Sequence, residues 1–348
     1  MRLQSYLNLI DFNADGIGVP FHVDIANSLW HNSLEYSRPL GARQTFVLGV
    51  EFRRDAFTGN VTRNQRKRLD QYSLYLQDAI ALLPKVTITL GGRIDHKPRT
   101  TTEIPLRAAL VFSPSATQSF RLTAAQGFRS PSLVEYFVVS QFGPAQVLGS
   151  TALKPERAAA LEAGYRGLWG NEKILLGLDF FLEALSGFIF FDQRDLTTIS
   201  FVNGGKSTNT GGEAEVGLLL PHAWRVQATY AYEKISDQSS YLGFENSVPR
   251  SRAAFGVHRN PSAGIFFNLW AYTSGKTTWP FSYVSLPPVP LQVRMPSYFL
   301  VNTYAGYAFS PKVRAGISIL NLTNTQRAQF PFGEKQPRTL WGGLEASF

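Results

Sequence analysis

Short and long connections alternate along this chain, and their order limits the folds that it can adopt. They join segments in which apolar and polar residues alternate. Counted back from the C-terminus, the connections are short at 310–311, long at 275–297, short at 260–263, long at 235–250, short at 221–223 and long at 187–209. This order is typical of an up-and-down β-barrel of the outer membrane, which has short periplasmic turns and long extracellular loops. A soluble β-sandwich has no reason to separate its connections in this way.

The alternation within the segments has the period of a β-strand. In 86–95, Val86 and Ile88 share one face, and Thr87 and Thr89 share the other, as the side chains of a strand do. A membrane barrel turns its apolar face to lipid, whereas a soluble sandwich buries that face in its core. Most segments reach the length of about 9–11 residues that a tilted strand needs to cross a bilayer. We therefore predict an all-β, transmembrane, antiparallel up-and-down barrel.

We expect about sixteen strands, an even number as in bacterial barrels. The candidate segments exceed this number by one, and 171–203, which holds two of them, is therefore interpreted as one strand and a long loop with room for a hairpin. Turn-forming residues predict tight turns at 39–42, 83–84, 114–117 and 169–172. The candidate strands are 2–10, 29–38, 43–55, 70–82, 85–96, 102–113, 118–128, 156–168, 171–186, 188–203, 210–220, 223–234, 251–260, 264–274, 298–309, 312–321 and 339–348.

The composition excludes several classes of site. The chain has no cysteine, which removes disulfides, thiolate metal sites and cysteine nucleophiles. No apolar run reaches the length of about 18 residues that a transmembrane helix needs. The net charge is +9, but the cations are scattered and the run 63–68 is interpreted as a solvated loop tip. We therefore expect no nucleic acid partner.

Nothing in the sequence favours an enzyme, a resident metal or a cofactor. The histidines have no metal-ligand spacing, and no nucleophile elbow, Walker loop or dinucleotide fingerprint occurs. A lipase site with Ser73 and His96 is conceivable but is not favoured. Inward-facing acidic residues are instead expected to pair with arginines across the lumen. The acids are Asp95, Glu213, Glu215, Glu233 and Glu345, and the arginines are Arg93, Arg225 and Arg314.

Five motifs, in a fixed order, resemble those of TonB-dependent outer-membrane receptors. Each motif is weak alone, but together they extend the resemblance over roughly residues 30–348. They are Tyr72–Asp78 with Leu90–Asp95, Gly127–Ser132, Leu153–Glu156 with Glu162–Tyr165, Asn203–Gly205 with Gly211–Glu215, and Leu320–Asn324 with the terminal Phe348.

The resemblance implies a function and a set of partners. Receptors of this family have an N-terminal plug inside a barrel of about 22 strands, and they take up scarce ligands such as ferric siderophores. This chain has no plug and no TonB box, and its N-terminus has no apolar stretch of signal length. We therefore expect residues 1–348 to be the C-terminal barrel portion of such a receptor, without the plug and the first strands.

The partners implied by the resemblance follow from that interpretation. They are outer-membrane lipid and lipopolysaccharide, a siderophore-like small molecule, TonB only through the missing plug, and the barrel-assembly machinery through the C-terminal strand ending in Phe348. Two alternatives stay open. The chain could form a plug-free passive porin of about sixteen strands, or it could be a soluble β-structured binding protein.

The motif Gly127–Ser132 and the long loops supply the candidate ligand contacts. Arg129 is expected to pair with Glu156 or Glu162, with direct ligand contact as the other possibility. The resemblance implies that family members taking up haem carry a histidine in the loop after this motif; the stretch 130–154 contains none, so we expect that the ligand is not haem. Cationic loops with aromatic walls suit an anionic, partly aromatic chelate, although the cations could bind lipopolysaccharide phosphates instead. The predicted contacts are Arg129, Tyr136, Phe137, Phe142, Trp279, Phe281, Tyr283, Arg327 and Phe330.

Overall fold

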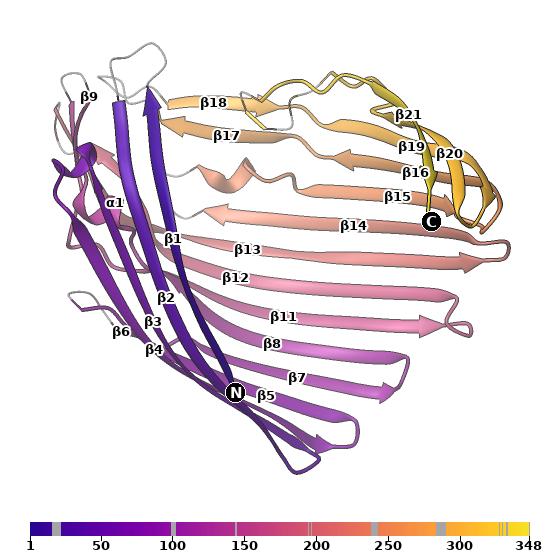
Figure 1. Cartoon of the computed structure of the whole chain (residues 1–348), viewed down its shortest axis with the longest axis horizontal. Coiled ribbons are helices and arrows are strands. Elements are labelled where there is room, and N and C mark those ends of the chain that lie inside the picture. Colours follow the sequence, from indigo (N-terminus) through magenta and orange to yellow (C-terminus); the bar gives the residue numbers. More distant parts are fainter. Residues whose placement is uncertain are drawn as a thin grey trace. The chain divides into compact units, whose positions relative to one another are not determined.

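The computed structural model consists of two compact units and describes most of the chain (Figure 1). Unit 1 contains Met1–Val111, Leu122–Leu161 and Glu183–Ser207, and unit 2 contains Phe112–Arg121, Glu162–Leu182 and Thr208–Phe348. The described residues are 1–15, 22–98, 102–142, 145–193, 195, 197–237, 243–282, 290–326, 328, 330–331 and 333–347.

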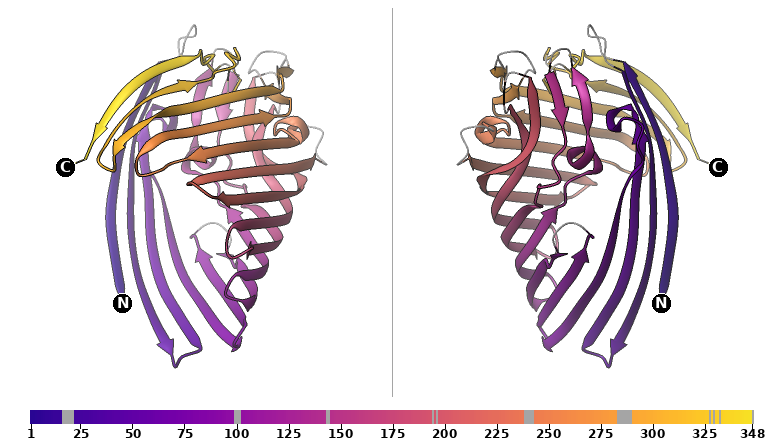
Figure 2. Two further views of the ribbon diagram at one scale, coloured as in Figure 1. Left: turned by 90° about the vertical axis from the view of Figure 1, so that its right-hand side faces the viewer. Right: turned by 90° about the vertical axis from the view of Figure 1, so that its left-hand side faces the viewer.

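Five long strands of unit 1 form a continuous antiparallel ladder in the order of the sequence, and they lie side by side in Figures 1 and 2. The short strand β6 (Thr102–Glu103) extends the ladder beyond the end of β5. One row of the register joins Leu34, Val50, Leu74 and Ile94. The five strands are β1 (Arg2–Asp15), β2 (His22–Leu40), β3 (Gln44–Gly59), β4 (Lys67–Leu83) and β5 (Val86–His96).

The two faces of this ladder differ in exposure in the way that a membrane barrel requires. Val50 and Leu74 are 48% and 46% exposed on one face, whereas Ser73 and Asp95 are 7% and 3% exposed on the other. A soluble sheet would bury the apolar face and expose the polar face. The alternation therefore places the apolar side chains outward, as predicted for a strand wall that faces lipid.

The ends of the unit 1 strands that lead into long connections are covered by short elements. The 3-10 helix η1 (Asn60–Thr62) follows β3, and α1 (Leu133–Phe137) is followed by the hairpin of β9 (Val139–Phe142) and β10 (Ala145–Leu148). Strand β10 also pairs in parallel with β13 at Gln146 and Thr198. Together they bury a hydrophobic cluster: Phe57, Val61, Leu133, Tyr136, Val138, Val147, Leu153, Ile199 and Phe201.

Unit 2 contains a second antiparallel ladder in sequence order. Its long connections carry the 3-10 helix η2 (Phe244–Asn246) and a separate hairpin of β17 (Thr277–Ser282) and β18 (Pro290–Met295). The ladder strands are β14 (Trp224–Asp237), β15 (Ser251–Arg259), β16 (Gly264–Ser274), β19 (Tyr298–Ser310), β20 (Val313–Leu320) and β21 (Thr339–Ala346).

Sixteen of the strands within the described residues have eight or more residues: β1–β5, β7, β8, β11–β16 and β19–β21. This number agrees with the predicted one. The remaining long strands are β7 (Leu106–Ser115), β8 (Gln118–Arg129), β11 (Glu156–Trp169), β12 (Ile174–Gln193) and β13 (Thr198–Leu220). No helix among the described residues is long and apolar enough to cross a bilayer.

Two predicted boundaries are wrong. The expected long connection 187–209 is mostly strand, because β12 continues to Gln193 and β13 begins at Thr198. Glycine and asparagine suggested a loop there, but a strand accommodates glycine at local irregularities, and Gly187 and Gly205 have φ values of 71° and 75°. The expected strand 102–113 is interrupted before Leu106, where Pro105 has no N–H for a ladder.

Candidate functional site

Arg129 lies at the end of β8 and binds two carboxylates at once. Its Nε and Nη2 donate to Glu156 at 2.7 Å each, and its Nη1 and Nη2 donate to Glu135 at 3.0 Å each. The predicted pair with Glu156 is therefore confirmed, whereas Glu162 lies 3.6 Å from Arg121 instead. Bidentate guanidinium–carboxylate bonds fix both distance and orientation. We call these three side chains the Arg129 clamp.

The sequence after Arg129 explains why Glu135 reaches it. Pro131 has no N–H and restricts Ser130, which ends the strand. Ser132 then caps α1, because its Oγ accepts from the Glu135 N–H at 3.2 Å while its own N–H donates to Glu135 Oε2 at 2.6 Å. Burial would raise the pKa of Glu135, but hydrogen bonds from Arg129 and Ser132 outweigh burial and hold this pKa below its usual value. The lowered pKa favours the carboxylate form of Glu135, which accepts the two hydrogen bonds from Arg129.

Two further motifs meet at the clamp. Glu156 Oε1 also accepts the Ile189 N–H at 2.8 Å. Asn203 accepts the Lys154 N–H at 2.7 Å and donates to the carbonyl oxygens of Lys154 and Gly187, both at 2.8 Å. Sequence reasoning quoted Asn203 as part of a motif but assigned it no role. Its side chain holds the start of β11 to β12 and β13, because an amide can accept and donate at the same time.

A cavity of about 710 Å³ in unit 1 is lined by the residues 126–134 around the clamp. We call it the motif cavity. Its strand wall contributes Arg53, Asp55, Arg93, Asp95 and Lys97, so that with Arg129 four cations face two acids. The pairs Arg53–Asp55 and Arg93–Asp95 are 2.9 and 2.8 Å long. Burial lowers the pKa of Lys97, which lies beyond the end of β5. The cavity is polar, but its lining cations are offset by carboxylates: the clamp holds Arg129, and Glu51 lies 3.0 Å from Arg93.

A second cavity of unit 1, of about 820 Å³, lies at the start of β4. We call it the cationic cavity; it is lined by Arg66, Lys67, Arg68, Leu69, Asp70, Pro98, Tyr136, Phe137 and Thr151. Lys67 Nζ lies 5.5 Å from the centroid of the Phe137 ring, a cation–π distance. Tyr136 is 4% exposed and belongs to the hydrophobic cluster. Within the described residues its hydroxyl has no hydrogen-bond partner.

The structure describes only some of the other predicted ligand contacts, and it does not place these in a common cavity. Phe142 ends β9, and Phe281 pairs with Leu291 in the β17–β18 hairpin, but neither side chain is among the described ones. Trp279 is 37% exposed and donates to Thr277 at 3.2 Å, and Phe330 is 61% exposed. Tyr283, Arg327 and the terminal Phe348 lie outside the described residues. Arg129, Tyr136 and Phe137 are thus the predicted contacts that line described cavities of unit 1.

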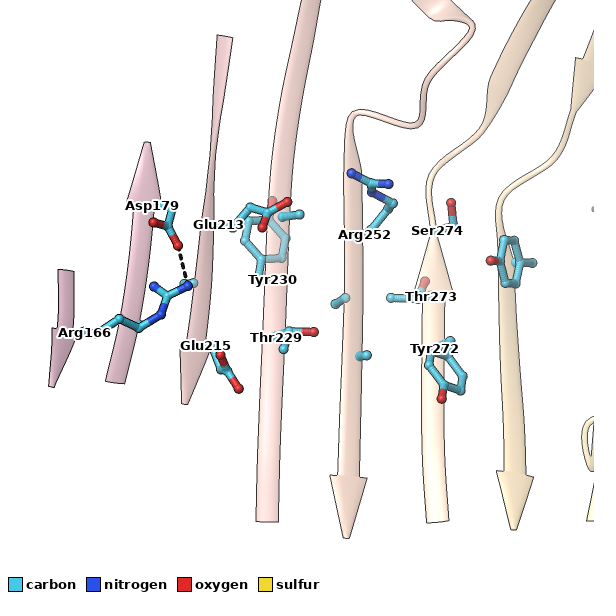
Figure 3. Close-up of a pocket in the computed structure, with 16 residues that line it drawn as sticks. Arg166, Asp179, Glu213, Glu215, Thr229, Tyr230, Arg252, Tyr272, Thr273 and Ser274 are labelled. Atoms are coloured by element: carbon cyan, nitrogen blue, oxygen red, sulfur yellow. Dashed lines mark ion pairs between the residues drawn. The ribbon is translucent and has the colours of Figure 1, made fainter. Parts of the chain in front are cut away.

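The polar wall of unit 2 contains a smaller cavity of about 430 Å³ (Figure 3). Arg166 binds Asp179 there at 2.7 Å, but Glu213 and Glu215 make no ion pair within the described residues. The predicted pairing of these two glutamates with arginine is therefore not found among the described residues, although Arg166 and Arg252 line the same cavity.

Other predicted acid–arginine pairs have mixed outcomes. Asp95 and Glu345 do pair with Arg93 and Arg314, at 2.8 and 3.4 Å, but these partners lie on the same strand and on the neighbouring strand rather than across the lumen. Glu233 pairs at 3.4 Å with Arg252 rather than Arg225. Ser73 and His96 lie in adjacent positions of the β4–β5 register, paired with Asp95 and Tyr72 respectively, so their side chains point to opposite faces of the ladder. The described residues also contain no group of histidine and carboxylate side chains that could hold a metal ion.

Comparisons with known proteins give a consistent result. The family model described as "TonB dependent receptor-like, beta-barrel" matches residues 3–322. The "Iron-regulated outer membrane virulence protein" of Vibrio cholerae serotype O1 is 21% identical over an alignment that is 357 residues long with its gaps and that covers 94% of this chain and 52% of the relative.

Solved structures show the same likeness in the fold. The siderophore receptor PirA from Acinetobacter baumannii superimposes with a TM-score of 0.75 at 14% identity, over 96% of this chain and 56% of PirA. The ferric enterobactin receptor PfeA, in complex with BCV-L6, has a TM-score of 0.79 at 17% identity, over 99% of this chain and 59% of PfeA; other structures of PfeA are from Pseudomonas aeruginosa. The chain thus spans little more than half the length of these relatives.

Proposed function

This chain belongs to the TonB-dependent receptor β-barrel family, and from this premise we propose that it forms the barrel portion of an outer-membrane receptor for a ferric siderophore. The observation that carries the ligand class is the pair of cavities beside α1 in unit 1. The cationic cavity has more cations than acids and aromatic side chains in its wall, and the motif cavity next to it is lined by paired charged groups. PirA and PfeA are named as receptors for siderophores and for ferric enterobactin, which supports the same class.

The chemistry of the cationic cavity suits an anionic aromatic chelate. Arg66, Lys67 and Arg68 outnumber Asp70, and such an excess attracts an anion before contact and holds it afterwards. The Phe137 ring offers a flat surface against which an aromatic ring system can stack. The Arg129 clamp, in this proposal, holds α1 and its aromatic residues in place beside the cavity.

The membrane location follows from the family and from the exposed apolar wall. We propose that the outward residues of unit 1, such as Leu74 and Val50, contact lipid in the outer membrane of a Gram-negative cell. TonB would act through a plug that these residues do not include, and the barrel-assembly machinery would recognise the C-terminal strand ending in Phe348. Transport by the receptor as a whole belongs to this proposal as well.

One observation favours a second function, a passive porin. The sixteen long strands of the described residues are an even number, as in bacterial barrels that close on their own. A porin predicts steady ion conductance when the purified chain is inserted into a planar bilayer, and no saturable siderophore binding.

Fluorescence titration of the purified 348-residue chain in detergent separates the two functions. Ferric catecholate is expected to quench tryptophan fluorescence saturably, and the variant Arg66→Gln/Lys67→Gln is expected to bind about tenfold more weakly, because charge-assisted contacts are lost. Lys312→Gln, at the short turn after β19, is the matched control and should bind as the unchanged chain does. Equal binding by the double variant, or conductance without binding, would contradict the siderophore proposal. Haem is expected to give no Soret shift.

A further inference from the structure

The polar face of the unit 2 strands is hollowed where those strands carry glycine and alanine. The cavity of about 430 Å³ there has Gly177, Ala231 and Ala254 in its lining. A Cβ atom at Gly177 would lie 2.9 Å from Arg166 Nη1, so that a larger residue would displace this side chain. The opposite face of the same ladder carries exposed apolar residues such as Phe255. The cavity therefore lies on the face that a barrel turns to its lumen.

One row of the strand register crosses the cavity, and its chemistry changes from strand to strand. Thr229 of β14 is the register partner of Ala254 of β15, and Ala254 is the partner of Tyr272 of β16. In Figure 3, Glu215 of β13 lies at the level of Thr229. Neighbouring strands are about 4.8 Å apart, so the row extends over about 14 Å from β13 to β16. A carboxylate thus lies at one end of the row, a phenol ring at the other, and a methyl group between them.

This cavity has an excess of negative charge. Its arginines are already engaged, because Arg166 binds Asp179 at 2.7 Å and Arg252 lies 3.4 Å from Glu233. Neither of the two β13 glutamates that line the cavity has an ion pair within the described residues. The next arginine of β14, Arg225, lies four positions, about 13 Å, beyond the row. In the cavity and the ion pairs around it, the acids are Glu162, Asp179, Glu213, Glu215 and Glu233, and the arginines are Arg121, Arg166 and Arg252. The excess attracts a cation.

The Tyr272 ring is held in place at the aromatic end of the row. It stacks on Trp270, with ring centroids 5.8 Å apart and an angle of 19° between the planes. A ring face attracts a cation, because its π-electrons carry negative partial charge. The Glu215 carboxylate attracts the same kind of group at the other end. Each end of the row therefore suits an ammonium group, and the Ala254 methyl between them suits methylene groups.

We propose that this cavity of unit 2 binds an elongated organic polycation of the polyamine type. One ammonium group of the ligand contacts Glu215, its methylene chain lies over Ala254, and another ammonium group lies at the face of the Tyr272 ring. A metal ion would occupy only the acidic end, and the described residues contain no group of acidic and histidine side chains that could hold one. The ligand is opposite in charge to the siderophore proposed above, so the inference does not rest on that function.

Isothermal titration calorimetry of the detergent-purified chain with spermidine, at low ionic strength, tests the acidic end of the row. The unchanged chain is expected to bind spermidine saturably, and Glu215→Gln is expected to bind it about tenfold more weakly, because a charge-assisted hydrogen bond is lost. Glu172→Gln is the matched control, because Glu172 is an exposed glutamate of unit 2 in the short turn before β12, and it should bind as the unchanged chain does.

Two further positions test the rest of the row. Tyr272→Leu removes the ring and is expected to weaken spermidine binding about threefold, whereas Tyr272→Phe keeps the ring and should bind nearly as the unchanged chain does. Ala254→Leu fills the middle of the row and should weaken binding at least as much as Glu215→Gln. Folding of each variant is checked by the fast-migrating band of the folded barrel on unheated denaturing gels.

Four outcomes would overturn the inference: no saturable binding of spermidine, equal binding by Glu215→Gln and Glu172→Gln, equal binding by Tyr272→Leu and Tyr272→Phe, or magnesium chloride binding as tightly as spermidine. The last result would mean that charge alone, and not the row from Glu215 to Tyr272, determines binding. Spermidine binding without ferric catecholate binding would leave the inference standing and refute only the proposed function. Ferric catecholate binding without spermidine binding would do the reverse.

Discussion

The long connections of unit 1 and unit 2 are held in place by different kinds of interaction. In unit 1, apolar side chains from β3, η1, α1, β10 and β13 bury one another in the hydrophobic cluster, and the Arg129 clamp lies beside it. In unit 2, the segment after β20 is held by hydrogen bonds of one buried asparagine. Asn321 is 4% exposed and has a φ of 55°, in the left-handed region that asparagine tolerates.

The backbone N–H and both polar side-chain atoms of Asn321 make hydrogen bonds. Its N–H donates to Asn302 Oδ1 at 2.9 Å, and its Nδ2 donates to the carbonyl oxygens of Thr325 at 3.2 Å and Gln336 at 2.9 Å. Its Oδ1 accepts the Thr325 N–H at 2.8 Å. We call these contacts the Asn321 knot.

The comparison of the unit 1 cluster with the Asn321 knot shows two ways in which long connections of a strand wall are ordered without a central core. Apolar burial is non-directional and grows with the area removed from water, so the unit 1 cluster can hold several segments through one shared interior. Hydrogen bonds are directional and costly to leave unmade, so the Asn321 knot specifies one backbone path. A loop base held by burial offers a stable frame beside a ligand cavity.

The largest expected effect concerns the unit 1 cluster. Phe57 is 3% exposed within it, and Phe57→Ala should destabilise the connections of unit 1 by about 3–5 kcal/mol through lost burial and a cavity. Phe180→Ala, at a 60% exposed position, is the matched control. Limited proteolysis should cut 130–155 much faster in the first variant only. Equal cleavage of both variants would show that apolar burial does not hold these connections.

The Asn321 knot should contribute somewhat less. Asn321→Ala removes the three side-chain hydrogen bonds of the knot and puts alanine at positive φ, and we expect a loss of about 2–3 kcal/mol. Asn321→Asp keeps the acceptor but turns a second, charged oxygen towards the carbonyl oxygens of Thr325 and Gln336 in a buried position, so its effect should be at least as large. Hydrogen exchange at Thr325 reports the change. A double-mutant cycle with Asn302→Ala should show coupling, and strict additivity would mean that the knot is not a unit.

The Arg129 clamp should have a smaller effect on stability. The Arg129 side chain is 47% exposed, so solvent screening limits the loss in Arg129→Gln to about 1–2 kcal/mol even though two carboxylates remain facing each other. Arg121→Gln is the control on the same strand, because Arg121 makes longer ion pairs of 3.4 and 3.6 Å at 50% exposure. The temperature at which each variant loses the fast-migrating band of the folded barrel on unheated denaturing gels measures the stability of both variants. A larger effect of Arg121→Gln would refute the clamp's role.

The smallest effect is a pH dependence of α1. Because the pKa of Glu135 is lowered in the folded chain, its contribution is fully present above the ordinary glutamate pKa of about 4.3 and is lost as pH falls through the folded value. Hydrogen exchange of 133–137, corrected for intrinsic rates, should be unchanged from neutral pH to about pH 5 and accelerate below the ordinary pKa. Glu135→Gln should abolish this change, and a change that survives in the variant would assign it to another group.

Local pattern was enough to predict much of the strand wall. The turns near 39–42 and 169–172 and the shared face of Val86, Ile88 and Leu90 follow from residues that are neighbours in sequence, because strand alternation and turn chemistry are local properties. The Arg129–Glu156 pair was also predictable, because one residue ends a strand and the other begins the next long one. The sequence could not exclude Glu162 as the partner of Arg129, because the partner of Glu162 depends on the stagger between neighbouring strands.

The positions of the long connections could not be predicted in this way. The Asn203 bonds and the β10–β13 parallel pair join segments that are distant in sequence, and no period marks such contacts. Tyr136 was predicted as a ligand contact because it is an aromatic residue in a long connection. The structure places it in the hydrophobic cluster beside the cationic cavity, and its role towards a ligand stays a prediction.

The sequence by itself determined the all-β class, the number of long strands and which side of each strand is apolar, because these depend on period and length along the chain. Only the tertiary structure decided which side faces outward, which acids meet which arginines and how Asn321 and Phe57 hold their connections. These features depend on register and on side chains that meet through space. Burial and hydrogen bonding stabilise contacts between segments whatever their separation in sequence. Such contacts can therefore be identified only in the folded chain.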